Sequence, residues 1–161
     1  MKVKVNVSNR HIHLSEKDLF KLFGDGYKLG KKKSLEQPGE FASLEKVTLI
    51  TKKGKIEGVR IIGPCRAKTQ VELSNTDALV LGINPPLRDS GVLDKSETVT
   101  IEGPEGKIVA KNSTIIARRH IHITPDEASE YGLENNDLVN VYFDGERSGV
   151  LGSVRIKSNS N

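Results

Sequence analysis

Every histidine of this 161-residue chain lies in one of two copies of the tripeptide His-Ile-His, His11–His13 and His120–His122. On a β-strand, residues two apart point to the same side, about 6.6 Å apart along the strand, so both imidazoles of a copy can bind one metal ion. On a helix, the same spacing would direct the two rings apart. Because the two copies use all the histidines, we favour metal binding over buried, hydrogen-bonded histidines. The intervening Ile12 and Ile121 are then expected to point into the core.

Zinc is the metal that these donors favour, because imidazole and carboxylate suit it and catalytic zinc sites usually have three protein ligands. An internal repeat predicts the third ligand. The segment 71–83 aligns with 121–133, and Glu72 falls at the position of His122. We therefore expect His11, His13 and Glu72 to share one zinc ion. The alternative for Glu72 is a salt bridge on the face of a strand.

The repeat also predicts the elements that position these side chains. Both histidine motifs run directly into helix-start signals, Ser15-Glu-Lys-Asp and Thr124-Pro-Asp-Glu, so each reads as a strand followed by a capped helix. A hairpin pattern, Val47-Thr-Leu followed by Gly54-Lys-Ile, recurs 99 − 47 = 52 residues later. The middle and end of the chain thus repeat a hairpin, a strand with a metal-type residue and a capped helix.

Short β-branched runs between Gly- and Pro-containing turns predict a mostly β fold with short helices. With the repeat, they predict tandem small β-barrels, the second of them incomplete. We place the first barrel at 1–88 and the second at 89–161, with the break near Pro85-Pro86. Strands are expected at 2–8, 46–51, 55–62, 68–73, 97–102, 107–117 and 138–143, and helices near 16–23, 75–80 and 125–131.

Composition excludes several classes of protein. No apolar run approaches the roughly 20 residues needed to span a bilayer, and the alternating N-terminus reads as a strand rather than a signal peptide. The single cysteine, Cys65, permits no internal disulfide, so we expect a cytoplasmic protein without a membrane partner. A net charge of +4 with only 4% aromatic residues fits a pocket for an anionic ligand better than a nucleic-acid surface.

Arg66 is the candidate anion-binding residue. The segment Gly63-Pro-Cys-Arg66 turns into the strand that carries Glu72, and a guanidinium there can hold a phosphate or carboxylate through two hydrogen bonds. Other basic residues add positive charge. They are Arg10, Arg118 and Arg119 beside the histidines, and the run Lys31–Lys33, which reads as a solvated stretch that could also receive a polyanionic cofactor.

Cys65, beside Arg66, is the one residue that suggests a nucleophile. If all four histidines bind metal, none is left to activate its thiol. We therefore assign Cys65 to packing.

A set of sequence blocks resembles the PduL-type phosphate acyltransferases, also called phosphate propanoyltransferases. The blocks follow the family's order and cover nearly the whole chain. They are Val5-Asn-Val-Ser-Asn-Arg-His-Ile-His-Leu-Ser, Gln37-Pro-Gly-x-Phe-Ala, Gly63-Pro-x-Arg-x-x-Thr-Gln-Val-Glu-x-Ser, Pro85-Pro-x-Arg-Asp-Ser-Gly and Ala117-Arg-x-His-Ile-His.

This resemblance implies a tandem β-barrel enzyme with two zinc ions. It would interconvert acyl-CoA and phosphate with acyl phosphate and CoA, the acyl group being propanoyl or acetyl. The family is associated with propanediol degradation and bacterial microcompartments. Matched by position, His11, His13 and Glu72 hold the first zinc, His120 and His122 hold the second, Arg66 binds phosphate, and Ser8, Lys33, Arg60 and Ile62 contact CoA.

The resemblance ends early. Family members continue past Val154-Arg-Ile with a further strand-to-helix unit that carries a histidine, so we expect a weakened second zinc site and low activity here. The first motif begins within ten residues of Met1, and no N-terminal encapsulation extension is expected. An unfinished barrel edge would favour a homodimer. Two alternatives are an inactive truncated paralogue that acts only as a metal- and CoA-binding module, and a small basic barrel that binds RNA or DNA.

Overall fold

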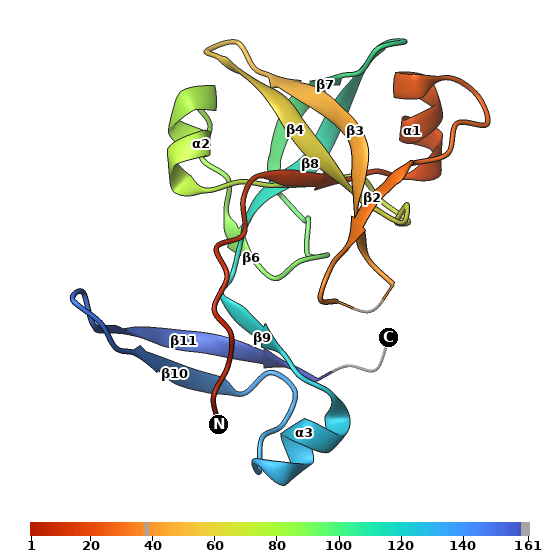
Figure 1. Cartoon of the computed structure of the whole chain (residues 1–161). Coiled ribbons are helices and arrows are strands. Elements are labelled where there is room, and N and C mark those ends of the chain that lie inside the picture. The colour runs from red at the N-terminus through yellow and green to blue at the C-terminus, as the bar shows by residue number, and fades with distance from the viewer. Residues whose placement is uncertain (38, 159–161) are drawn as a thin grey trace. The chain divides into compact units, whose positions relative to one another are not determined.

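In this computed structural model, which describes residues 1–37 and 39–158, one structural unit occurs three times (Figure 1). Each unit consists of a three-residue strand, a helix with a capped N-terminus, and a β-hairpin. The units are β1 (His11–His13), α1 (Glu16–Phe23), β3 (Phe41–Ile50) and β4 (Lys55–Gly63); β5 (Gln70–Glu72), α2 (Asn75–Leu81), β7 (Glu97–Glu102) and β8 (Lys107–Ala117); and β9 (His120–His122), α3 (Pro125–Glu130), β10 (Leu138–Phe143) and β11 (Gly149–Lys157).

Strand pairing is the same within each unit. The short strand runs parallel to the second strand of its own hairpin, so that β1 pairs with β4, β5 with β8 and β9 with β11. An oxygen of Ser15, Ser74 or Thr124 then accepts a hydrogen bond from the backbone three residues on and caps the helix that follows. The expected succession of strand, metal-type residue and capped helix is confirmed in all three copies.

The first two units close into one six-stranded barrel, in the order β3-β4-β1-β5-β8-β7. Antiparallel pairing of β1 with β5, and of β3 with β7, joins the two units. Two shorter strands extend this sheet: β2 (Lys31–Ser34) pairs with β3, and β6 (Leu87–Arg88) pairs with β8. Closure leaves no unpaired edge among the six barrel strands, which protects them from edge-to-edge association.

The barrel core is aliphatic, as the scarcity of aromatic residues requires. Ile12, Leu49, Ile61, Val71 and Ile101 are fully buried, one from each of five barrel strands. Each buried side chain of this size stabilises the fold by roughly 1.5–3 kcal/mol relative to exposure. Ile12 thus anchors the strand between the two histidines, as expected.

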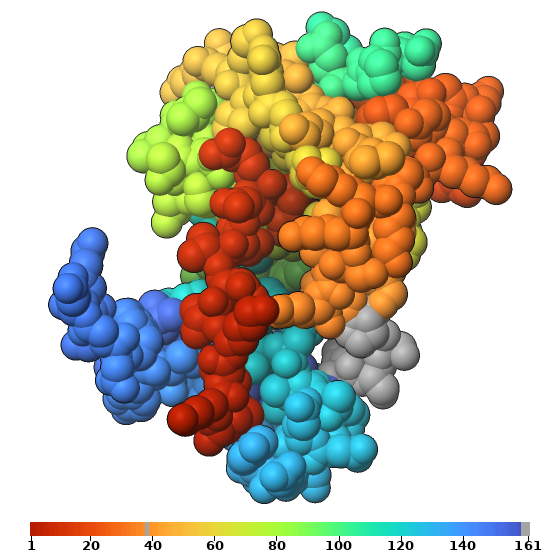
Figure 2. Space-filling view, viewed as in Figure 1, coloured from red at the N-terminus to blue at the C-terminus, as the bar shows by residue number. Residues whose placement is uncertain are grey.

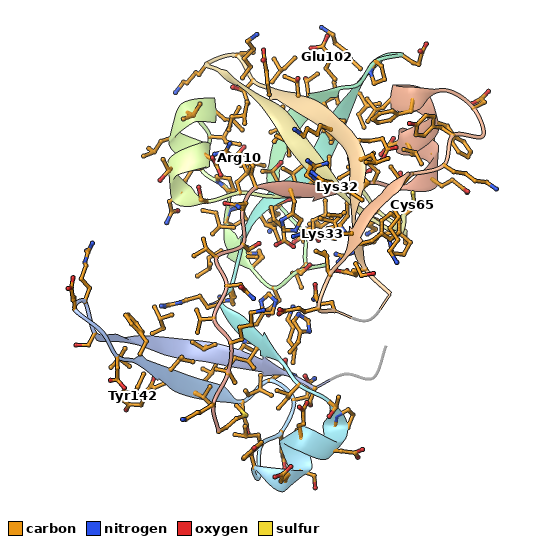
Figure 3. The ribbon with its side chains drawn as sticks, in the orientation of Figure 1. Arg10, Lys32, Lys33, Cys65, Glu102 and Tyr142 are labelled. Carbon is orange, nitrogen blue, oxygen red and sulfur yellow. The ribbon has the colours of Figure 1, made fainter. Side chains whose placement is uncertain are left out.

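Helix α1 covers one end of the barrel. Its buried residues are Leu19 and Leu22, and the Leu22 carbonyl accepts a hydrogen bond from the backbone N–H of Glu105 in the β7–β8 turn at 3.0 Å. In Figure 2 this turn, in sea green, lies directly against the orange-red surface of the α1 region. The same end is marked in Figure 3 by Glu102, which pairs with Lys107 at 2.8 Å.

The third unit forms its own three-stranded sheet, in the order β10-β11-β9. Val154, Ile156 and Ala128 make its small core. Ile121 lies opposite the fully buried Ile156, on the core side of this sheet, but it is only half-buried, whereas Ile12 is fully buried. The outer strand β10 exposes large side chains, including Tyr142, which is 74% exposed (Figure 3). The predicted mostly β fold, with one complete barrel and a second partial sheet, is confirmed.

Two details differ from the sequence-based expectations. Residues 2–8 are not a strand, because their alternation yields no buried face: Val5 and Val7 are 56% and 87% exposed. The expected division after residue 88 also differs from the compact unit around the barrel, which runs from Ser8 to Ala117 because β7 and β8 complete that barrel. The other compact unit combines Met1–Val7 with the chain from Arg118 onward.

Within the part of the chain that the structure describes, none of the helices is long and apolar enough to cross a membrane.

Candidate metal centre

The neighbouring strands β1 and β5 bring one carboxylate to the first histidine pair. His11 lies opposite Glu72, and His13 lies opposite Gln70. Directly opposite residues share a side of the sheet, as do residues two apart on a strand, so all four side chains point the same way. Ligand atoms of His11, His13 and Glu72 lie within 4.8 Å of one another, which allows them to hold one metal ion.

The ring of His11 is oriented by its own chain. Its Nδ1 donates a hydrogen bond to the Asn9 carbonyl at 2.8 Å. A neutral imidazole has one protonated nitrogen, so this bond leaves Nε2 with a free lone pair. That Nε2 lies 3.5 Å from Oε2 of Glu72. A histidine whose other nitrogen bonds a backbone carbonyl is the usual arrangement for a metal ligand.

His13 is more deeply buried, with 2% of its surface exposed. Burial, together with the positive charges of Arg66 and His11, lowers the pKa of His13 to about 3, so the ring is neutral at pH 7. Its hydrogen-bond partner is the Ile62 backbone, whereas its Nδ1 has no partner among the described residues. An unpaired buried nitrogen costs about 1–3 kcal/mol, and a metal ion would satisfy it. Two imidazoles and one carboxylate fit a zinc-type ion, which binds each imidazole through its unprotonated nitrogen.

The two oxygens of Glu72 have different surroundings. Oε1 accepts hydrogen bonds from Gln70 Nε2 at 2.6 Å and from Ser90 Oγ at 3.0 Å. Oε2 is the oxygen that faces His11. The carboxylate is therefore held on one side and open toward the histidines on the other.

Arg66 lies close enough for its charge to act on His13. Its backbone N–H donates to the Leu14 carbonyl at 2.9 Å, which fixes the residue beside the end of β1. Its guanidinium donates from Nη2 to Glu40 at 2.7 Å and from Nη1 to Ser90 Oγ at 3.3 Å. The side chain is 34% exposed, so this cation is both oriented and reachable from solvent.

The residues expected to contact CoA all belong to the same compact unit as the histidine–glutamate cluster. Lys33 on β2 and Ile62 on β4 flank Ala42 in one row across the sheet, and Arg60 lies opposite His11. Arg60 donates to the carbonyls of Ser43 and Leu44 at 2.7 and 3.2 Å. Ser8 is exposed and precedes β1 by three residues.

The lysine run makes up the first three of the four residues of β2, and all of its side chains are exposed. Figure 3 labels Lys32 and Lys33. Cys65 is half-buried against the barrel core, and burial raises the pKa of its thiol. Both features agree with its assignment to packing.

The second histidine pair, in the other compact unit, has nearly the same local geometry as the first. The rings of His120 and His122 are 4.8 Å apart at 84°, against 5.2 Å and 86° for His11 and His13. His120 Nδ1 donates to the Arg118 carbonyl at 2.7 Å, just as His11 donates to Asn9. His122 is exposed, whereas His13 is buried. The structure groups no third ligand with this pair among the described residues.

Three polar residues of the site were missed by the sequence analysis: Glu40, Gln70 and Ser90. Gln70 could have been found, because it precedes Glu72 by two residues on a strand and must share its side. Glu40 and Ser90 lie in loops, and no local periodicity signals that a loop residue will fold over a distant strand.

A comparison with protein families shows to which family the chain belongs. The family model described as phosphate propanoyltransferase matches residues 4–161. The chain belongs to the phosphate propanoyltransferase family. It is therefore an enzyme of the acyltransferase class.

Curated relatives support the same family over almost the whole chain. A phosphate propanoyltransferase of Priestia megaterium is 51% identical over 155 residues, covering 96% of this chain and 71% of the relative. Those of Rhodopseudomonas palustris and Thermotoga maritima are 50% and 49% identical, covering 96% and 95% of this chain and 69% and 73% of the relatives.

Proposed function

We propose that this chain transfers a propanoyl or acetyl group between CoA and inorganic phosphate, with a zinc ion held by His11, His13 and Glu72. The observation that carries the proposal is the convergence of three donor atoms within 4.8 Å around a buried histidine whose Nδ1 has no partner among the described residues. The family supplies the reaction class, and the donor chemistry favours zinc.

The reaction exchanges one bond for another. An oxygen of phosphate attacks the thioester carbonyl carbon, a C–O bond forms, and the C–S bond breaks, so that the sulfur of CoA leaves with the electron pair. A bound zinc ion would supply positive charge that stabilises the leaving thiolate. No covalent intermediate with the protein is needed.

Arg66 would hold the phosphate. An arginine has five N–H donors, and Arg66 uses two of them in its hydrogen bonds to Glu40 and Ser90. The others are available, within the described residues, to a phosphate near His13. Because Glu40 and Ser90 fix the plane of the guanidinium, it would orient the nucleophile as well as attract it.

Residues of β2 and β4 would hold CoA. Lys33 offers an exposed positive charge to the phosphates of the nucleotide, and Arg60 lies in register with the proposed ligand His11. Ile62 and Ser8 complete the proposed contacts. A cationic strand in the same compact unit as the cluster suits an anionic thioester.

His120 and His122 would contribute to a second, weaker zinc site, because two protein ligands are one fewer than catalytic zinc usually has. Their local geometry, so similar to that of His11 and His13, supports this assignment. The cytoplasmic location and a homodimer remain predictions.

A thiol-release assay tests the proposal. The metal-free chain is reconstituted with zinc and given propanoyl- or acetyl-CoA, with and without phosphate, while ³¹P NMR follows acyl phosphate. We expect zinc-dependent thiol release only with phosphate, and an equal amount of acyl phosphate. Thiol release without phosphate, or no turnover by the zinc-loaded chain in either direction, would overturn the proposed reaction.

A matched pair of variants tests the metal site separately. Glu72→Gln should lower the zinc content and abolish transfer, whereas Glu102→Gln, at the helix-capped end of the barrel, should change neither. His13→Ala should behave as Glu72→Gln does. A folded His13→Ala chain with unchanged zinc content would remove the histidine cluster from the proposal.

A further inference from the structure

Gln70 and Ser90 both touch the oxygen of Glu72 that does not face His11. We propose that these two residues, the Gln70–Ser90 clamp, position Glu72 as a one-oxygen metal ligand and couple it to Arg66 through the Ser90 hydroxyl. The inference rests on the metal centre of the proposed function and names residues that support it.

Both N–H donors of the Gln70 amide are used, and its oxygen accepts one hydrogen bond. Its Oε1 accepts the backbone N–H of Gly91 at 2.8 Å, which fixes the orientation of the amide because only oxygen can accept there. Its two N–H donors then go to Glu72 Oε1 at 2.6 Å and to Ser90 Oγ at 2.8 Å. Gln70 is 2% exposed, so each of these bonds forms away from water.

The hydroxyl of Ser90 is fully used. Its one proton goes to Glu72 Oε1 at 3.0 Å. Its two lone pairs accept from Gln70 Nε2 at 2.8 Å and from Arg66 Nη1 at 3.3 Å. A hydroxyl has one donor and two acceptor sites, so the set is complete.

The hydrogen bonds of the clamp determine which oxygen of Glu72 can bind a metal ion. Two donors hold Oε1, and that oxygen cannot turn toward the histidines without leaving both donors unpaired in a buried place. Oε2, 3.5 Å from His11 Nε2, is left as the single ligand atom. Partners of this kind around a ligand typically change metal affinity 10- to 100-fold.

The consequence for Arg66 follows from the shared hydroxyl. The Ser90 hydroxyl bonds both the Glu72 carboxylate and the Arg66 guanidinium, so a displacement of either group changes the position of the other. The segment 85–91 carries Ser90, and Gly91 ties that segment to Gln70 on β5. The clamp therefore fixes a loop over the strand that carries the proposed ligand.

Zinc affinity of the 161-residue chain, measured by competition with a chromogenic chelator, tests the clamp. Ser90→Ala should weaken zinc binding 10- to 100-fold. Ser90→Thr, which keeps the hydroxyl, should restore most of it. Ser96→Ala is the matched control, because it removes the same hydroxyl from a buried serine whose Oγ has no partner among the described residues.

Two further readouts separate positioning from general damage. In Co²⁺-substituted chain, Ser90→Ala should weaken the visible d–d absorption, because a second carboxylate oxygen raises the coordination number. In the enzyme assay, it should raise the KM for phosphate more than the KM for acyl-CoA. Gln70→Met, which keeps the volume but lacks the donors, should reproduce the affinity loss and the spectral change.

The outcomes distinguish the clamp from the function it rests on. If the unaltered chain binds no zinc, the proposed metal centre fails. If it binds zinc and Ser90→Ala and Gln70→Met both match Ser96→Ala in affinity, spectrum and KM, the metal centre stands and the clamp is overturned. Circular dichroism and thermal unfolding show whether each variant is folded.

Discussion

The two oxygens of the Glu72 carboxylate have different roles: one is held by hydrogen bonds, and the other is a proposed metal ligand. One oxygen accepts hydrogen bonds from Gln70 and Ser90, and the other faces His11. His13 does the same with its two nitrogens, since one has the Ile62 backbone as partner and the other has none among the described residues. Each proposed ligand is therefore oriented by the protein before any ion arrives, which lowers the entropy cost of binding.

Arg66 gives a prediction at this scale. Arg66→Ala should raise the KM for phosphate at least 10-fold and lower kcat, while the zinc content stays constant. Arg66→Lys should recover only part of the loss, because an ammonium cannot make the two-point contact of a guanidinium. Steady-state kinetics with varied phosphate checks both.

The exposed Arg147 in the β10–β11 turn provides the charge control, and Arg147→Ala should leave the KM unchanged. Unchanged phosphate kinetics in Arg66→Ala would show that phosphate binds elsewhere. Arg88 and Arg119 would then be the next residues to test.

Glu45 gives a pH-dependent prediction. Burial acts to raise the pKa of Glu45, but hydrogen bonds from Gly30, its own backbone and Tyr27 outweigh burial, and the net shift is downward from 4.5. Glu45 therefore binds its proton more readily in the unfolded chain. Its stabilising contribution is complete well above pH 4.5 and is lost as the pH falls through the lower folded pKa.

Glu45→Gln should consequently reduce stability by about 0.5–1 kcal/mol at pH 7, with the difference shrinking toward pH 3. Urea unfolding at several pH values measures the difference in the free energy of unfolding between Glu45→Gln and the unaltered chain. Glu105→Gln, at an exposed turn position, serves as the control with no change. A loss for Glu45→Gln that stays constant from pH 7 to pH 3 would contradict the argument.

At the scale of elements, a short strand followed directly by a capped helix occurs three times. The cap fixes where the helix starts, and the strand before it ends with a residue of the candidate site in each case: His13, Glu72 or His122. At the N-terminus of α2, Ser74 and Asp77 form a capping box, in which each side chain accepts a hydrogen bond from the other's backbone N–H. Asp77 also forms an ion pair with Arg10 at 2.8 Å. Figure 3 shows Arg10 beside α2.

Removal of that cap should be measurable. Ser74→Ala should destabilise the chain by about 1 kcal/mol, because it leaves a backbone N–H and an Asp77 oxygen without their partner. Ser148→Ala, in an exposed turn, should change stability by less than about 0.5 kcal/mol. Equal unfolding midpoints for the two variants would argue against the role of the cap.

The same elements show what the sequence could and could not predict. The helices were predicted almost to the residue, because caps are local signals, and the first two hairpins were predicted from their turns and repeats. Strand β11 of the third hairpin was not predicted. The strand expected at 2–8 was wrong, because alternation gives a strand only when one face is buried. Strand β2 was missed, because three exposed lysines carry no apolar pattern. Ser90 was missed because its partners are 18 or more residues away along the chain.

At the scale of the whole molecule, duplication explains both the fold and the site. Two copies of the strand, helix and hairpin unit close into a six-stranded barrel, and the short strand of each copy lies beside the other. The histidines therefore come from one copy and the glutamate from the next. The third copy repeats the strand, the capped helix and the histidine pair in a separate compact unit.

The central claim is that His11, His13 and Glu72 share one zinc ion, and anomalous diffraction at the zinc edge tests it most directly. Crystals of the zinc-loaded 161-residue chain should show a peak about 2.0–2.2 Å from one nitrogen of each histidine and from Oε2 of Glu72. A zinc-loaded crystal with no anomalous peak among these three side chains would contradict the account.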